Sequence, residues 1–92
     1  MANQNPPDHK LPMPQFGDQV YLTEGGEEFG AVRAVAPNGE PELLVYVENG
    51  GEFTVPLEAV VAVHDRKVIL REHALTAEMR AAIKHAHDRE DV

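Results

Sequence analysis

The chain lacks cysteine, serine and tryptophan altogether. Without cysteine it forms no disulfide and no thiolate metal site, which fits the reducing cytoplasm where we expect it to act. The usual nucleophiles are thereby reduced to three threonines, and none of them has a recognisable base and orienting group. We therefore expect a protein that is not an enzyme and that carries no cofactor.

Basic residues and long apolar runs are also scarce. Eight Lys and Arg stand against sixteen Asp and Glu, which gives a formal net charge of −8. Phosphate binding depends on clustered cations, so direct binding of nucleic acid is disfavoured, and the negative field favours a basic partner. No apolar run approaches the roughly 20 residues of a membrane helix, and the first residues do not resemble a signal peptide, so we expect no membrane insertion.

The positions of proline and glycine divide the chain into two regions. Residues 1–15 carry four prolines among polar residues, and we expect them to form a disordered, proline-rich arm. From Phe16 onward, short apolar runs alternate with glycine-containing turns at 24–27, 37–40 and 48–51. This alternation is typical of an antiparallel β meander.

Six short runs are the candidate strands. They cover residues 19–22, 28–36, 42–47, 52–55, 59–63 and 67–70, with a helical turn at 56–58 and a hairpin turn at 64–66. The runs 43–47 and 60–63 are apolar at consecutive positions, so each should be covered on both faces. One cover is a barrel interior, and the other is the C-terminal helix, the N-terminal arm or a second copy of the chain.

One amphipathic helix is expected within residues 73–92. Thr76 is its candidate N-cap, and residues 88–92 should fray. An apolar stripe at helical spacing marks the face that lies on the sheet, and it consists of Leu75, Met79, Ala82, Ile83 and Ala86.

Several short motifs follow one another along the chain in a recognisable order. They are Val20-Tyr21, Gly25-Gly26, Phe29-Gly30-Ala31-Val32, the run 43–47, Phe53-Thr54-Val55-Pro56-Leu57, Ala59-Val60 and Val68-Ile69-Leu70. This order resembles the PRC-barrel family, known from the photosynthetic reaction centre H subunit and from a ribosome-maturation factor. The resemblance covers about residues 16–71 and implies a small six-stranded antiparallel β-barrel at 16–72, followed by the C-terminal α-helix. Family members act as protein-interaction modules, so it implies binding and transfers no catalytic residue.

Histidines and an acidic turn are the remaining candidates for chemistry. His85 and His87 are two positions apart, so on a helix they point about 200° away from each other and cannot share one ion. His64 falls in a turn and His73 in the link to the helix, so we predict solvated or capping histidines and no metal site. The acidic residues at 24–28 lack the spacing of a calcium loop, and we predict a solvated hairpin tip.

These observations favour a cytoplasmic, PRC-barrel-like adaptor that binds another protein or itself. We predict that its contact surface comprises Leu44, Tyr46, Val61, Val63, Met79 and Ile83. An accessory factor in RNA metabolism or ribosome assembly, acting through a basic protein partner, is one alternative. A small ligand-binding barrel or enzyme is another, and its sign would be a large pocket lined by His64, His73 and acidic residues.

Overall fold

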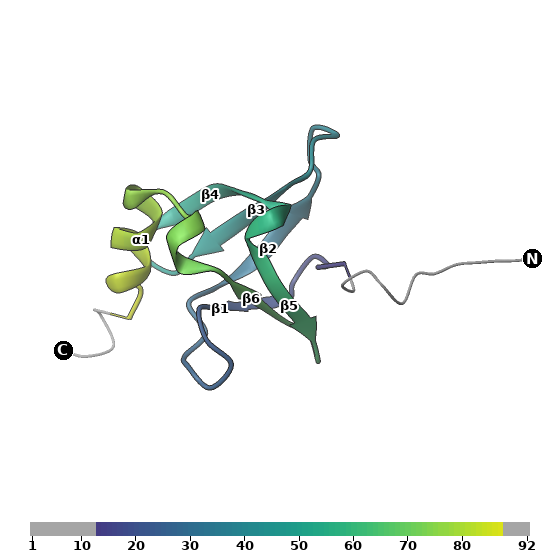
Figure 1. The fold of residues 1–92 in the computed structure, drawn as a ribbon. Helices are drawn as coiled ribbons and strands as arrows, with labels where there is room; N and C mark the ends of the chain where they lie inside the picture. Colours follow the sequence, from purple (N-terminus) through teal and green to yellow (C-terminus); the bar gives the residue numbers. More distant parts are fainter. Residues whose placement is uncertain (1–12, 88–92) are drawn as a thin grey trace, which may run out of the picture.

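Residues 13–87 are described in a computed structural model, which arranges them as a curved six-stranded sheet with one α-helix at one end (Figure 1). The mainly β fold with a C-terminal helix is as predicted, and every strand lies within two residues of its expected position. The strands are β1 (Gln19–Tyr21), β2 (Gly30–Val35), β3 (Glu42–Val47), β4 (Gly51–Pro56), β5 (Val60–His64) and β6 (Lys67–Leu70). The helical elements are the 3-10 turns η2 (Leu57–Ala59) and η3 (Glu72–Ala74) and the helix α1 (Ala77–Lys84).

The sheet is neither purely antiparallel nor closed, so the predicted antiparallel barrel is wrong in both respects. The strand order is β4-β3-β2-β1-β6-β5, and β1 pairs with β6 in parallel while all other neighbours are antiparallel. This pairing makes β4 and β5 run in the same sense, although only the three residues of η2 join them. A parallel pair needs a crossover of a dozen or more residues, so β4 and β5 cannot pair and the result is a half-barrel.

The interior of the half-barrel is packed mainly with valine. Strand β3 alternates between buried Leu43, Val45 and Val47 and half-buried residues that face outward. The largest side chains with essentially no exposed surface are Leu43, Leu70, Met79, Val20, Val32, Val45, Val47, Val55 and Val68. Burial of such side chains is the main stabilising contribution, at about 1.5–3 kcal/mol each.

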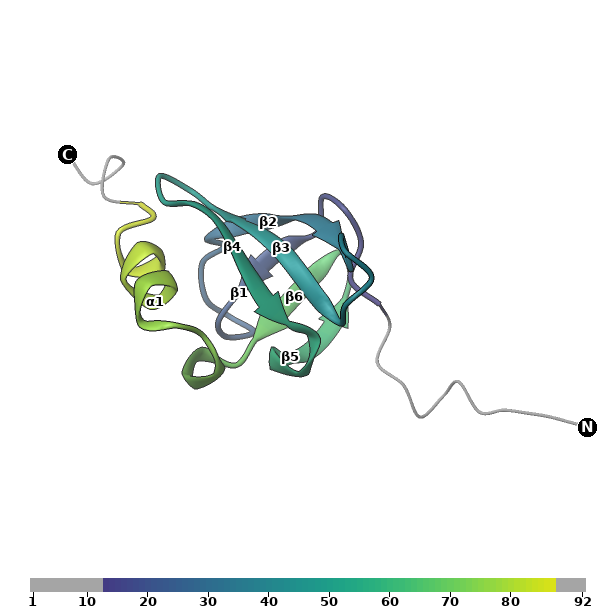
Figure 2. The same ribbon diagram turned by 90° about the horizontal axis from the view of Figure 1, so that it is seen from above.

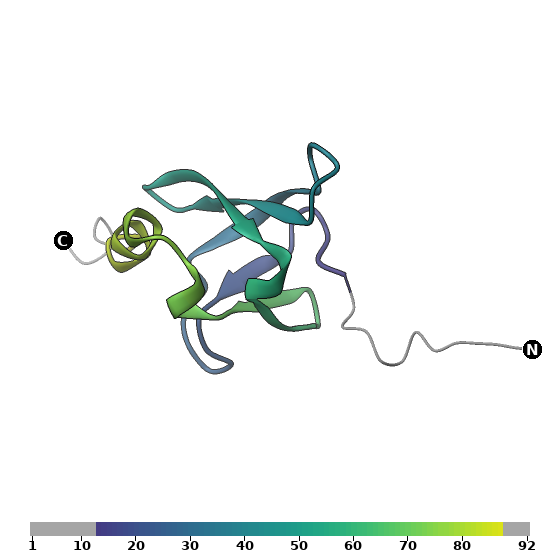
Figure 3. The ribbon, with the colours of Figure 1, turned by 45° about the horizontal axis from the view of Figure 1, so that its top comes forward.

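Helix α1 covers one open end of the half-barrel, as Figures 2 and 3 show. The predicted apolar stripe supplies this contact, because Leu75, Met79 and Ala86 are buried in the core and Ala82 and Ile83 pack against it. Thr76 is the N-cap, and its Oγ1 accepts a hydrogen bond from the backbone N of Met79 at 3.1 Å.

The helix is shorter than the predicted range of 73–92. It ends at Lys84, and residues 88–92 lie outside the described part of the chain. After the helix, Asn49 Nδ2 donates a hydrogen bond to the Ala86 carbonyl at 2.7 Å, which joins this turn to the β3–β4 connection. Across residues 13–87, no helix has the length and apolar character that a membrane crossing requires.

Only the last part of the predicted arm is described, since residues 1–12 lie outside the structure's described range. Pro14 is buried, and the backbone N of Gln15 donates to Asp18 Oδ2 at 2.9 Å. The segment preceding β1 is therefore joined to the end of the half-barrel opposite α1 (Figure 2).

The parallel pairing of β1 with β6 is secured by the ion pair between Asp18 and Arg66. Asp18 is the one charged side chain in the core of residues 13–87, with 2% of its surface exposed. Arg66 Nε donates to Asp18 Oδ1 at 2.5 Å, and the backbone N of Gln19 donates to the Arg66 carbonyl at 3.0 Å. Because a buried carboxylate is costly unless both oxygens are satisfied, this arrangement strongly favours one register.

Gly30 is required by the close approach of β2 to β3. A Cβ atom at this position would lie 1.8 Å from the backbone oxygen of Tyr46. We expect Gly30→Ala to lower the free energy of unfolding by about 3 kcal/mol or more, because the backbone of β3 would have to move. Gly25→Ala is the matched control, since no atom lies within 4 Å of its Cβ. Equal urea midpoints for the two variants would contradict the packing described.

Asp18→Asn tests the ion pair between buried Asp18 and Arg66, whose side chain is 68% exposed. The amide places an N–H group against either Arg66 or the backbone N of Gln15, so we expect a loss of about 2 kcal/mol in the free energy of unfolding. Asp65→Asn is the control, because that side chain is 87% exposed and its replacement should change stability by less than about 0.5 kcal/mol. Urea denaturation followed by circular dichroism measures both, and similar values would exclude a structural role for Asp18.

Candidate functional site

The six residues predicted to form one contact surface do not lie together. Leu44 and Tyr46 project from the outer face of β3 and are half-buried. Arg33 lies over the Tyr46 ring at 4.8 Å and its Nε is 3.8 Å from Glu52 Oε2, so charged side chains border this face. In the sheet, β2, β1 and β6 separate β3 from β5.

Two of the six residues are in the chain's own core. Met79 is 1% exposed and Val63 is 9% exposed, and both belong to the hydrophobic cluster inside the half-barrel. Assigning them to a contact surface is therefore wrong for the folded chain, because both side chains already pack in its hydrophobic core. Ile83 is half-buried and packs against the edge of the same cluster.

Val61 is the predicted residue that is most available to a partner. It is 46% exposed and lies at the point in β5 where the register with β6 shifts between Val60 and Ala62. Such a bulge leaves an extra residue that is turned away from the regular alternation. Val61 lies on a strand whose other edge pairs with no strand of the region 13–87.

A hollow of about 330 Å³ adjoins the end of β5. Its lining combines Met13 and Val63 with polar groups from Asp18, His64 and Arg66. Met13 and Phe16 both lie in the segment before β1, and they are 56% and 68% exposed. Together with Val61, these are the exposed large apolar side chains of the described chain.

His64 links the β5–β6 hairpin to the loop between β1 and β2. Its Nε2 lies 2.8 Å and 3.0 Å from the two carboxylate oxygens of Glu24, and its Nδ1 lies 3.4 Å from Asp65 Oδ2. The hydrogen bond to Glu24, helped by that to Asp65, raises the pKa of His64 above 6.5. The acidic turn is thus not simply a solvated tip, because one of its carboxylates holds the loop against the sheet.

His87, for which the sequence predicts a solvated or capping role, is held by a backbone carbonyl. Its side chain is 23% exposed, and its Nε2 lies 2.7 Å from the backbone oxygen of Glu28. Its Nδ1 lies 3.6 Å from Glu48 Oε1, and Glu27 Oε1 is 3.9 Å from Nε2. The contact brings together the β1–β2 loop, the β3–β4 turn and the residues after α1.

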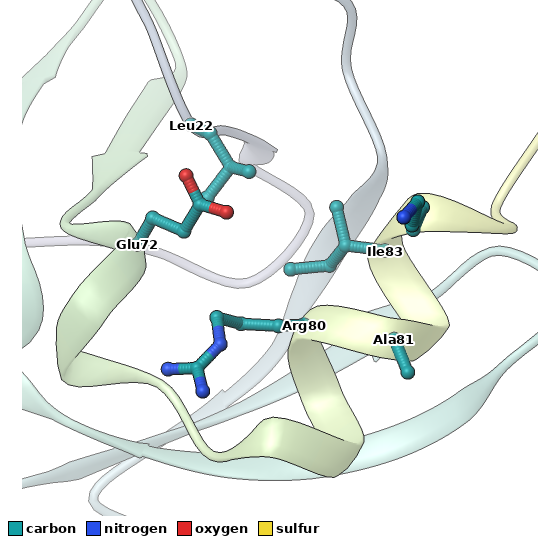
Figure 4. A pocket seen from close by; sticks show the side chains of 6 residues that line it. Leu22, Glu72, Arg80, Ala81 and Ile83 are labelled. Atoms are coloured by element: carbon teal, nitrogen blue, oxygen red, sulfur yellow. The ribbon is translucent and has the colours of Figure 1, made fainter.

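A larger, open hollow of about 560 Å³ lies between α1 and the loop after β1 (Figure 4). Leu22 and Ile83 form its apolar part, while Glu72 and Arg80 reach into it from η3 and α1. Arg80 Nη1 donates to the Leu75 carbonyl at 2.8 Å. The guanidinium group is therefore held against the residue that precedes the N-cap of α1. His73 lines neither this hollow nor the one beside β5, so neither of these two hollows combines His64 with His73 as a ligand-binding barrel would require.

Comparison of the chain with models of protein families, with curated proteins and with solved structures yields no match.

The sequence did not reveal Asp18, Met13 or the pairing of His64 with Glu24. Asp18 follows a glycine just before β1, which is a common turn signal, but its partner is 48 residues away. Glu24 and His64 are 40 residues apart, so no local spacing connects them. These contacts depend on the parallel pairing of β1 with β6, which the hairpin pattern alone does not predict.

The bridge between His64 and Glu24 should make the loop contact depend on pH. Because the folded-state pKa is raised above 6.5, the contact stabilises the fold fully below that value and is lost as pH rises through the folded-state pKa. An NMR titration of the His64 ring should give a midpoint above 6.5, and Glu24→Gln should lower it. Glu27→Gln, in the same loop, should leave the His64 midpoint unchanged. A wild-type midpoint at or below that of the Glu24 variant would contradict the bridge.

Proposed function

We propose that this protein is a non-catalytic protein-interaction module that receives an extended, basic segment of another protein along β5. The observation that carries the proposal is the outer edge of β5, which pairs with no strand among residues 13–87. An exposed strand edge offers unpaired backbone N–H and C=O groups, and an extended peptide that adds to it gains main-chain hydrogen bonds. The residues from Val60 to Val63 are all apolar, and His64, the last residue of the strand, is paired with Glu24.

The other edge of the sheet differs from β5 in the way expected of a protected edge. Strand β4 exposes Glu52 and Thr54 and ends in Pro56. Charged side chains and proline discourage the addition of a further strand. This contrast favours β5 as the docking strand.

The hollow next to β5 supplies a place for a side chain of the added segment. Met13 and Val63 give it apolar walls, and it lies beside the strand end at His64. Recognition by strand addition commonly combines backbone hydrogen bonds with pockets for alternate side chains. Exposed Phe16 lies in the same segment before β1 as Met13.

Charge favours a basic partner over a second copy of the chain. The net charge is −8, so two copies would repel each other, while a segment rich in Lys or Arg would be attracted. Glu58 precedes β5 and exposed Asp65 follows it, which places acidic groups at both ends of the strand. The PRC-barrel resemblance of residues 16–71 supports the same class of function, because that family consists of interaction modules.

Val61→Lys tests the docking strand. We expect a ten-residue peptide of alternating Lys and Val, titrated into the ¹⁵N-labelled chain, to shift the amide signals of residues 60–64, and a Glu–Val peptide to leave them in place. Val61→Lys should weaken binding of the Lys–Val peptide at least tenfold, since it puts a cation on the contact strand. Thr54→Lys adds the same charge to the β4 edge and should bind as the wild type does.

Three outcomes would contradict the proposal. The two peptides could shift the amide signals of residues 60–64 equally, or the shifted signals could belong to β4 or α1. The Val61→Lys variant could also bind the Lys–Val peptide with unchanged affinity. A sedimentation mass of two chains that returns to one chain in Val61→Lys would instead identify a second copy as the occupant.

A further inference from the structure

Three potential metal ligands from distant parts of the sequence meet beside the C-terminal end of α1. Glu28 lies in the loop before β2, Glu48 follows β3, and His87 follows α1. Figures 2 and 3 show the β3–β4 turn reaching toward this end of the helix. One ligand atom from each residue lies within 4.8 Å of the other two, and all three residues are half-buried. We propose that these residues bind a divalent cation of the zinc class.

The orientation of His87 fits a metal ligand. The Glu28 backbone oxygen can only accept a hydrogen bond, so His87 Nε2 is the donor across the 2.7 Å contact. In the neutral ring the lone pair is then on Nδ1, which faces the Glu48 carboxylate at 3.6 Å. Metal-binding histidines typically donate their second ring N–H to a backbone carbonyl or carboxylate in this way, which fixes the tautomer and the ring plane.

The spacing of the ligand atoms is close to that of a zinc site. Bonds of about 2.0–2.1 Å in tetrahedral geometry place neighbouring ligand atoms roughly 3.3 Å apart. The separation of 3.6 Å between His87 Nδ1 and Glu48 Oε1 is near this value. Glutamate side chains have several rotatable bonds, so a small rotation brings the carboxylates of Glu28 and Glu48 to bonding distance.

Hydrogen bonds that do not use these ligand atoms hold the three segments in place. The backbone N of Glu48 donates to the Phe29 carbonyl at 2.9 Å, which joins the β3–β4 turn to the residue after Glu28. Asn49 Nδ2 donates to the Ala86 carbonyl at 2.7 Å, which places the residue before His87. The positions of the ligands are therefore largely set before a cation binds, which lowers the ordering cost of binding.

The chemistry of the ligands selects the cation. One imidazole and two carboxylates suit Zn²⁺ better than Ca²⁺ or Mg²⁺, which prefer oxygen ligands throughout. Glu27 Oε1, 3.9 Å from His87 Nε2, adds a further negative charge that attracts a cation. A bound ion would connect the end of α1 to the sheet, so the expected role is structural and is independent of docking at β5.

Titration of the tag-free, metal-free full chain with ZnCl₂ tests the site. We expect one ion per chain by calorimetry and a rise in Tm of roughly 10 °C or more when zinc exceeds Kd a hundredfold. Long-range ¹H–¹⁵N spectra of the imidazoles should show hydrogen on Nε2 of His87 and a zinc-induced shift at its Nδ1. His87→Gln and Glu48→Gln should each weaken binding at least tenfold, while His85→Gln, in the same turn, should bind as the wild type does.

Each alternative result overturns the proposal. No heat and no change in Tm at millimolar zinc would mean that His87 and Glu48 form only an ion pair. Zinc binding that persists in both variants, or that shifts other histidine rings instead of His87, would place the ion elsewhere. Because the wild-type spectra locate the ion directly, the test stands even if one variant does not fold.

Discussion

The contact between Asp18 and Arg66 is the constraint on which the rest of this fold depends. It joins the start of β1 to the hairpin between β5 and β6, where no turn or crossover specifies how the strands should meet. Both oxygens of the buried carboxylate are satisfied, one by Arg66 and the other by the backbone of Gln15. A shift in register would leave this charge without its partners, at a cost far above that of a surface ion pair.

The same contact explains why the two halves of the sheet form one core. Strands β1 to β4 make one wall by successive hairpins, and β5 with β6 makes the other. The seam between β1 and β6 is only three residue pairs long, from Gln19 with Lys67 to Tyr21 with Ile69. So short a parallel pair is weak by itself, and burial of Val20 and Val68 on its inner face supplies most of its stability.

Local signals in the sequence were sufficient for the elements but not for their arrangement. Asn-Gly turns, alternating apolar residues and the stripe from Leu75 to Ala86 predict the strands and the helix, because these patterns reflect contacts between near neighbours. The parallel seam and the open side of the barrel depend on the sense in which the chain leaves η2. Pro56 and Leu57 indicate a corner there, but they do not encode its direction.

Site residues were harder to predict, for a related reason. The four consecutive apolar residues Val60-Val61-Ala62-Val63 are compatible either with a strand covered on both faces or with a bulge that exposes one of them. The structure has the bulge, which exposes Val61 and buries Val63. Helical spacing relates His87 only to near neighbours such as His85, whereas its contacts come from two loops that the topology brings to the end of α1.

The seam between β1 and β6 also affects how the chain folds as it is synthesised. Asp18 cannot pair with Arg66 until 48 further residues have been synthesised. At a translation rate of about 5–20 residues per second, this delays the ion pair by roughly 2–10 s. During that interval the β2–β3–β4 meander can form from local turns, while one edge of β1 has no partner. A nascent chain with an incomplete wall and an unpaired first strand is the form in which this protein is most exposed to aggregation and to chaperones.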